Sequence, residues 1–147
     1  MVGAAGVIAT LVYLSVQLRQ NTIALKSNSW QAIQDSEQRF DELLGSDSKI
    51  CELWVRGIEG GLEALGNDGE KVQFMILAKQ LIDQFQTHHY QFERGLIEEE
   101  MWGTWKAQFE DHAAEWPGLR EVLMQRRKYL RPSFRRFVAD YVRDDDA

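Results

Sequence analysis

The sequence predicts an all-α protein, in which a long N-terminal helix continues into a small antiparallel bundle of about five to six helices. Apolar residues recur at every third or fourth position through most of the 147 residues, as they do on one face of a helix. No segment alternates apolar and polar residues for long enough to indicate a strand. Glycine, proline and capping residues divide the chain into segments of helical length, which is typical of helices joined by short turns.

The first 18 residues are the most apolar segment, since they carry no charged side chain and the first charge is Arg19. Eighteen helical residues extend about 27 Å, close to the ~30 Å thickness of the hydrocarbon core of a bilayer. We therefore expect a membrane-anchor segment at residues 1–20, a helical domain at residues 21–143 and an acidic tail at residues 144–147. The alternative is that this helix is buried in a soluble assembly.

The charges that flank this segment predict its orientation. Arg19 and Lys26 follow it, whereas no Lys or Arg precedes it, so the positive-inside rule places the bulk of the chain in the cytoplasm. A cleaved signal peptide is disfavoured, because the segment lacks a basic start and an A-x-A-like exit. We expect a single-pass protein with residues 1–18 in the membrane. The only cysteine, Cys51, has no intramolecular partner, which fits a reducing compartment.

Glycine and proline mark where the helices are expected to end or begin. The first helix should continue to Leu44, because no turn residue interrupts it before Gly45. A short helix follows, and the helix from Glu70 to Arg94 is predicted to be central to the domain. Apolar residues from Leu119 to Leu130 indicate one further short helix. The expected breaks lie at Gly60-Gly61, Gly95, Pro117-Gly118 and Pro132-Ser133.

Two adjacent histidines on the central helix are the sharpest candidates for chemistry. His89 lies one turn before Glu93, so His88, His89 and Glu93 could ligate a metal or pass a proton if other helices added groups. Adjacent side chains on a helix diverge by about 100°, however, so both imidazoles cannot point at one compact site. Because His88 continues the apolar stripe of Leu81 and Phe85, we favour core histidines over a metal site.

Three of the five tryptophans raise the question of a ligand pocket. Trp102, Trp105 and Trp116 are expected to share one helical face, where they could line a hydrophobic pocket between helices. We favour packing, because large aromatic side chains at helical spacing commonly fill the interiors of bundles. Phe85 and Trp105 are accordingly predicted to lie in the core.

A basic cluster is the most unusual feature of this acidic chain, which has a net charge of −6. Six cations fall within eleven residues, from Arg126 to Arg136. Arg127, Arg131 and Arg135 are candidates for binding anionic lipid headgroups or a partner, as expected beside a negative membrane leaflet. The favoured alternative is a solvated face that pairs with the protein's own acids, such as Glu98 to Glu100.

Other common functional sites are not indicated. The net negative charge disfavours general nucleic-acid binding, which needs an excess of cations on the protein. The chain contains no Gly-rich phosphate loop, GxSxG, HExxH or EF-hand pattern, and none of its histidines follows a glutamate by three residues as in di-metal bundles. We therefore predict no cofactor, no catalytic residue and no nucleic-acid partner.

Several stretches resemble a group of uncharacterised bacterial proteins that begin with a membrane helix. The run LVYLSVQLRQNTIAL, from Leu11 to Leu25, is similar to their start, and LWVRG, which ends at Gly57, is similar to their LWxxG segment. The run YQFERGLIEEEMWGTW, which begins at Tyr90, and the region that begins WPG and ends at Phe137 complete the likeness. The resemblance implies a bacterial inner-membrane location and a small helical domain, and it implies no catalytic residues.

Packing, anchoring and charge account for every strong feature of the sequence. The favoured function is therefore a membrane-tethered helical module that binds a partner protein or associates with itself. The alternative is a helical-bundle enzyme, or a ligand- or metal-binding protein, with a site around His89, Glu93 and the tryptophans.

Overall fold

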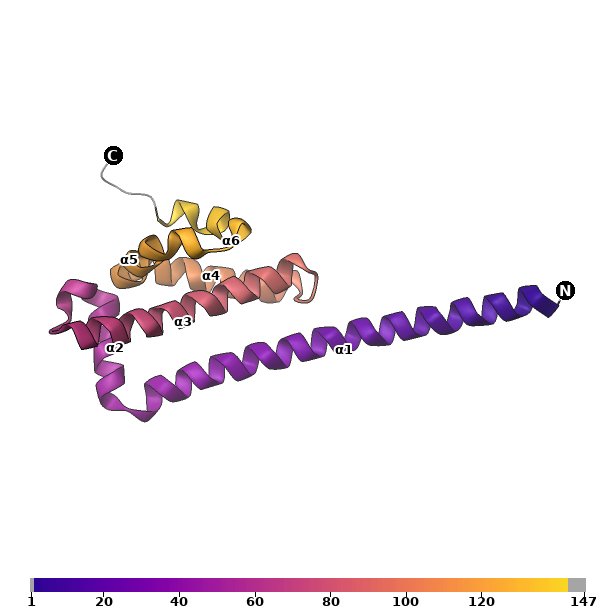
Figure 1. The fold of residues 1–147 in the computed structure, drawn as a ribbon, viewed down its shortest axis with the longest axis horizontal. Coiled ribbons are helices and arrows are strands. Elements are labelled where there is room, and N and C mark those ends of the chain that lie inside the picture. The colour runs from indigo at the N-terminus through magenta and orange to yellow at the C-terminus, as the bar shows by residue number, and fades with distance from the viewer. Residues whose placement is uncertain (1, 143–147) are drawn as a thin grey trace.

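The computed structural model describes the backbone of residues 2–142 and the side chains of residues 6–142, and it confirms the all-α class (Figure 1). No strand occurs within the described residues. Three 3₁₀ turns lie at Leu62–Ala64, Arg127–Tyr129 and Val138–Asp140. The helices are α1 (Val2–Ser46), α2 (Ser48–Gly60), α3 (Asp68–Glu93), α4 (Glu99–Glu115), α5 (Pro117–Arg126) and α6 (Pro132–Phe137).

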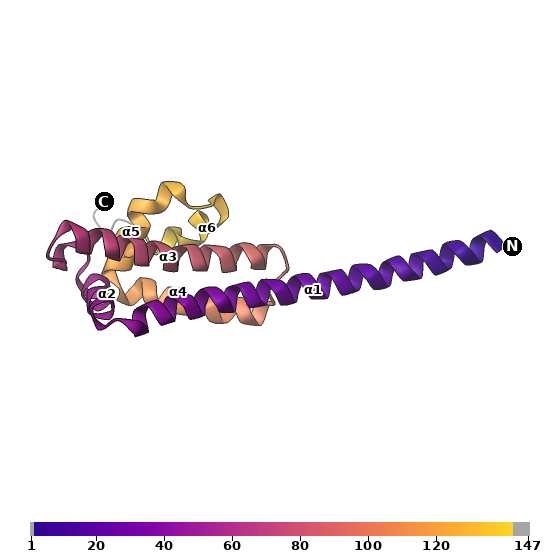
Figure 2. The same ribbon diagram turned by 60° about the horizontal axis from the view of Figure 1, so that its bottom comes forward.

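Helix α1 is a single helix of 45 residues, which corresponds to a length of about 67 Å. Its C-terminal half lies along the other helices, and its N-terminal half projects away from them (Figures 1 and 2). Every residue from 6 to 25 is exposed, and Lys26 is the first that is half-buried. The helix passes Gly45 and ends at Ser46, after which Asp47 caps α2 by accepting a hydrogen bond from the Lys49 amide at 2.8 Å.

Within the described part of the chain, no helix is both long enough and apolar enough to cross a membrane. The anchor segment predicted from the sequence begins with residues 1–5, whose side chains lie outside the described part. The acidic tail predicted at residues 144–147 also lies outside it.

Helix α3 is the centre of the domain, since it packs against each of the other five α-helices. Phe74 on α3, Phe109 on α4 and Phe134 on α6 are completely buried. The predicted core positions Phe85 and Trp105 are only 4% and 6% exposed, which confirms both. The apolar stripes read from the sequence therefore correspond to the faces that meet in the core.

Helices α2 and α5 approach each other closely at two glycines. A Cβ atom built on Gly118 would lie 1.9 Å from the carbonyl oxygen of Gly57, and one built on Gly57 would lie 2.2 Å from the Phe74 ring. Beside this contact, the ring centroids of Trp54 and Trp116 are 6.0 Å apart. The LWVRG and WPG runs noted in the sequence therefore pack against each other.

Of two expected boundaries near the C-terminus, the structure confirms one and corrects the other. The break expected at Pro117-Gly118 is present, since α4 ends at Glu115 and Pro117 is the first residue of α5. The helix expected to continue to Leu130 ends at Arg126. The chain is extended at Leu130 and Arg131, with ψ of 147° and 142°, because the residue before a proline disfavours the helical conformation.

Candidate functional site

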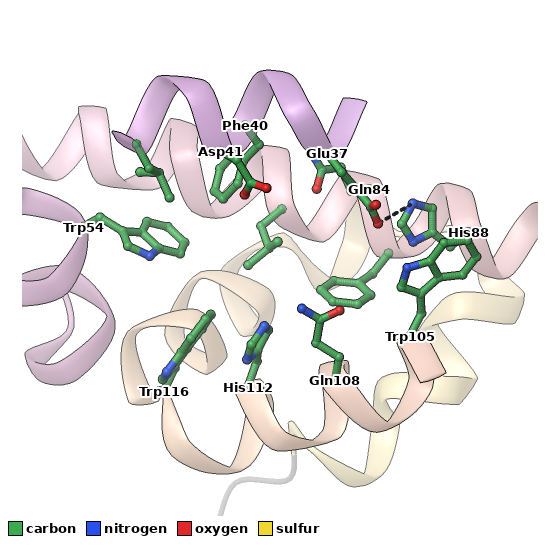
Figure 3. Close-up of a pocket in the computed structure, with 13 residues that line it drawn as sticks. Glu37, Phe40, Asp41, Trp54, Gln84, His88, Trp105, Gln108, His112 and Trp116 are labelled. Atoms are coloured by element: carbon green, nitrogen blue, oxygen red, sulfur yellow. Dashed lines mark ion pairs between the residues drawn. The ribbon is translucent and has the colours of Figure 1, made fainter. Parts of the chain in front are cut away.

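A cleft with a volume of about 330 Å³ lies between α1, α2, α3 and α4 (Figure 3). Helix α1 is on one side and α4 on the other, while α3 lies behind them and Trp116 closes one end. We call it the acidic cleft. Its lining residues are Glu37, Phe40, Asp41, Leu44, Trp54, Leu81, Gln84, Phe85, His88, Trp105, Gln108, His112 and Trp116.

Helical spacing places the polar groups of the cleft on facing surfaces. Glu37 and Asp41 are four residues apart on α1, as are Gln84 and His88 on α3, and residues four apart share one face of a helix. On α4, Gln108 and His112 repeat the same spacing. Figure 3 shows the carboxylates of α1 across the cleft from the polar side chains of α4. Three polar pairs from three helices therefore surround one space.

Aromatic rings form the ends of the cleft. At one end, the Trp116 ring stacks on His112, with centroids 3.7 Å apart and an angle of 11° between the planes. Trp54 meets Trp116 edge to face. At the other end, the Trp105 and His88 ring centroids are 4.2 Å apart. Indole side chains thus flank the polar groups at both ends.

Burial sets the charge state of His88, which is only 3% exposed. Desolvation lowers its pKa from the ordinary 6.5 to about 4, so the imidazole is neutral near pH 7. Its Nε2 atom lies 3.9 Å from Oε1 of Glu37, too far for a hydrogen bond. Its Nδ1 atom is buried and has no hydrogen-bond partner among the described residues. His88 therefore lines the cleft as an uncharged group with unused polar capacity.

The other titratable groups of the cleft are two acids, Glu37 and Asp41, and a second histidine, His112. Burial raises the pKa of Glu37. A hydrogen bond from the Trp105 side chain lowers that pKa in part, and the charge of Asp41 raises it further. Burial lowers the pKa of His112, and the nearby acids Asp111 and Glu115 oppose this. None of the thirteen residues that line the cleft is Lys or Arg. The acidic side chains of Glu37 and Asp41 therefore have no basic residue beside them in the lining of the cleft.

His89 lies on another side of α3, away from the cleft. It packs between Trp102 and Phe137, at centroid distances of 5.2 and 5.4 Å. Its Nδ1 atom is 3.6 Å from Oε2 of Glu93, and that carboxylate accepts a hydrogen bond from Ser133 at 2.8 Å. Burial lowers the pKa of His89, which Glu93 opposes. The two histidines therefore diverge, as their adjacency on a helix predicts.

Of the site considered around His89, Glu93 and the tryptophans, the structure brings together His89, Glu93 and Trp102. Trp102 also stacks on Phe92 at 5.5 Å, whereas Trp105 and Trp116 line the acidic cleft. The three tryptophans that were weighed as the lining of one pocket therefore lie in two places. Across the described residues, no group of three or more His, Cys, Asp or Glu side chains is arranged to hold a metal ion.

Sequence reasoning missed the acidic members of the cleft. Glu37 and Asp41 resemble an ordinary solvated face, and Gln84 lies within a largely apolar stripe. The signal in the sequence was a pair of polar residues four positions apart on each of α1 and α3, beside the buried Phe40 and Phe85. Such a pair indicates a cleft only when the helices that face each other are known.

The basic cluster divides into exposed and structural members. Arg135 is half-buried and donates to the backbone carbonyls of Lys128 and Leu130, at 3.4 and 3.0 Å, so it supports the turn before α6. Arg127 and Arg131 are exposed. No ion pair joins the cluster to Glu98, Glu99 or Glu100 within the part of the chain that the structure describes. Of the three predicted arginines, two are therefore exposed.

Tyr90 gathers two cations on its ring. The Arg131 guanidinium lies 3.8 Å from the ring centroid, and that of Arg94 lies 5.2 Å away. Arg94 therefore extends the basic surface onto the end of α3, although it lies outside the run from Arg126 to Arg136.

Acidification is expected to destabilise the protein through His88. The unfolded chain binds a proton at His88 below pH 6.5, whereas the folded chain does so only near pH 4, so stability falls as the pH is lowered across that range. The loss attributable to His88 is up to about 3 kcal/mol. Glu37, whose pKa is raised, acts in the opposite sense, and the lowered pKa values of His89 and His112 add to the loss. Denaturant unfolding at pH 4 and pH 7 measures the change in the free energy of unfolding between the two pH values. His88→Gln should flatten this dependence, and an unchanged dependence would contradict the assignment.

Carboxylates, imidazoles, amides and indoles line the acidic cleft. Such a mixture of aromatic walls and a few polar groups is typical of small-molecule sites. Comparison of the chain with protein families, curated proteins and solved structures gave no match.

Proposed function

We propose that the protein is a membrane-tethered helical module, which holds its helical domain at a bilayer surface to bind a partner protein or associate with itself. The observation that carries this proposal is the projecting half of α1. Ten large apolar residues between positions 7 and 25 are exposed there, from 47% at Leu14 to 67% at Leu18. Apolar surface of this extent in water is unfavourable and marks a site that another phase or molecule covers.

The exposure covers all sides of the helix, which favours lipid over a protein partner. Leu11, Val12, Tyr13 and Leu14 follow one another at about 100° intervals around the axis, and each is between 47% and 60% exposed. A coiled-coil seam needs only a narrow apolar stripe. Hydrocarbon, by contrast, covers a helix from every direction.

The polar groups of this segment support the same proposal. Thr10 donates to the carbonyl of Gly6 at 2.9 Å, and Ser15 donates to that of Leu11 at 2.8 Å. Their hydroxyl groups are therefore bonded within the helix, as is required in hydrocarbon, where water is absent.

In this proposal, residues 21–143 form an antiparallel bundle on the cytoplasmic side of a bacterial inner membrane. The positive charges at Arg19 and Lys26 favour this side, because cytoplasmic flanks are enriched in Lys and Arg. The exposed Arg127 and Arg131 are the members of the basic cluster that we assign to lipid headgroups or to the partner.

Charge placed in the projecting segment is expected to release the protein from membranes. A double variant, Leu11→Arg with Leu14→Arg, puts two cations at the centre of the proposed span, where each costs about 2.5–3.5 kcal/mol. Fractionation after carbonate extraction measures the effect. The wild-type protein should stay with the membranes, and the double variant should be found largely in the supernatant.

The matched control is Ile76→Arg on α3. Ile76 is 57% exposed, similar to Leu11 at 58%, but it lies on the domain. This variant should remain with the membranes. Quantitative release of the wild-type protein by carbonate would refute the tether.

A further inference from the structure

We propose that the acidic cleft binds a small organic cation, such as a substituted ammonium compound, between the carboxylates of α1 and the indoles of Trp54, Trp105 and Trp116. This goes beyond the proposed tethering function, since it gives the domain a ligand of its own.

Charge is the first argument. Glu37 and Asp41 face the same space, and the charge of Asp41 contributes to the raised pKa of Glu37. Among the described residues, neither is paired with a Lys or Arg. Because His88 is neutral at pH 7, it does not balance them either. A bound cation would relieve this repulsion.

The aromatic lining selects for the type of cation. Indole is the side chain that attracts a cation most strongly through its ring face, and three indoles line this one cleft. A quaternary or alkylated ammonium group is weakly hydrated, and it would meet Trp105 at one end of the cleft and Trp54 and Trp116 at the other, on faces that His88 and His112 leave uncovered. His88 adds an uncharged imidazole to the lining, and its buried Nδ1 atom has no hydrogen-bond partner among the described residues.

Size and position indicate a free solute. A volume of about 330 Å³ lies at the lower end of the range for small-molecule sites. If the proposed tether is correct, lipid headgroups border the end of the apolar segment at Leu18. The first cleft residue on α1, Glu37, is 19 positions further along, or about 28 Å along the helix axis. A headgroup in the bilayer is therefore too far away to occupy the cleft.

Other ligand classes fit the cleft less well. A metal ion would need three or more suitable ligands close together, and the described residues offer no such group. An anion would be repelled by the carboxylates of Glu37 and Asp41, which line the cleft. A purely apolar ligand would desolvate the acidic groups of Glu37 and Asp41 without offering them a polar partner.

The test uses choline as the probe and its uncharged carbon analogue 3,3-dimethyl-1-butanol as the control. The full-length protein is studied in a maltoside detergent, which carries no choline group. Indole N–H signals of the five tryptophans are followed by NMR. Choline should shift the signals of Trp54, Trp105 and Trp116 in a saturable way, while that of Trp102, outside the cleft, stays in place.

Removal of one carboxylate should weaken the binding of choline. Asp41→Asn keeps the shape of the side chain and removes its charge, and we expect its Kd for choline to rise at least about fivefold, or about 1 kcal/mol. The matched control Asp35→Asn, also exposed on α1 but outside the cleft, should leave the Kd unchanged. Glu37→Gln supplies a second variant, and an unchanged Trp102 signal shows that each variant is folded.

Three results would overturn the proposal. They are an absence of saturable shifts up to about 100 mM choline, equal shifts with 3,3-dimethyl-1-butanol, and an equal Kd for Asp41→Asn and Asp35→Asn. None of these measurements depends on a membrane, so their failure is distinguishable from failure of the proposed tether.

Discussion

Replacement of Phe85 by alanine is expected to lower the free energy of unfolding by about 3–5 kcal/mol. Phe85 is 4% exposed and its ring meets that of Phe109 edge to face at 5.2 Å. Truncation removes this contact and leaves a cavity that α3 and α4 cannot close without moving. Trp105→Ala, at a site 6% exposed, should have an effect of the same size.

Denaturant unfolding of the purified protein measures both losses through the transition midpoint. Tyr129→Ala is the control, because Tyr129 is 67% exposed and its removal should change stability by less than about 0.5 kcal/mol. Midpoints for Phe85→Ala that equal those of the control would show that the core is not built around α3 and α4.

Replacement of Gly118 by alanine is expected to cost about 3 kcal/mol or more. The added methyl group would lie 1.9 Å from the carbonyl oxygen of Gly57 and 3.1 Å from the Phe74 ring. A backbone atom cannot turn away as a flexible side chain can, so α2 and α5 must separate. Separation would also open the contact between Trp54 and Trp116.

Gly103→Ala is the matched control for this substitution. Gly103 lies inside α4, and no atom outside its own helix comes within 4 Å of the position of its Cβ. Alanine is the better helix former, so this change should stabilise the protein by about 0.5–1 kcal/mol. Thermal unfolding of the two variants should move in opposite directions, and a shift of the same sign would contradict the close approach at Gly118.

The helices and the core were predictable because they depend on local pattern. The stripes through Phe85 and Trp105 repeat at helical spacing, so each helix shows its buried face without knowledge of its neighbours. The end of α5 at Arg126 was not predicted, because Leu130 continues the apolar spacing although Arg127–Tyr129 form a 3₁₀ turn and Pro132 favours extended backbone at Arg131.

The cleft depends on tertiary placement and was therefore hidden in the sequence. Glu37 and Asp41 are ordinary polar positions until α4 places Gln108 and His112 opposite them. The contact of Gly57 with Gly118 joins residues 61 positions apart, and neither glycine signals its partner. The separation of His88 from His89, in contrast, follows from helical geometry alone and was anticipated.

The continuity of α1 makes the projecting segment and one wall of the cleft parts of the same rigid rod. No glycine or proline occurs between Val7 and Leu44, so the rod has no sequence-encoded hinge. The tilt and rotation of the projecting half about its axis therefore also determine the direction in which Glu37 and Asp41 face. In an anchored molecule, the cleft would keep a fixed orientation relative to the membrane surface.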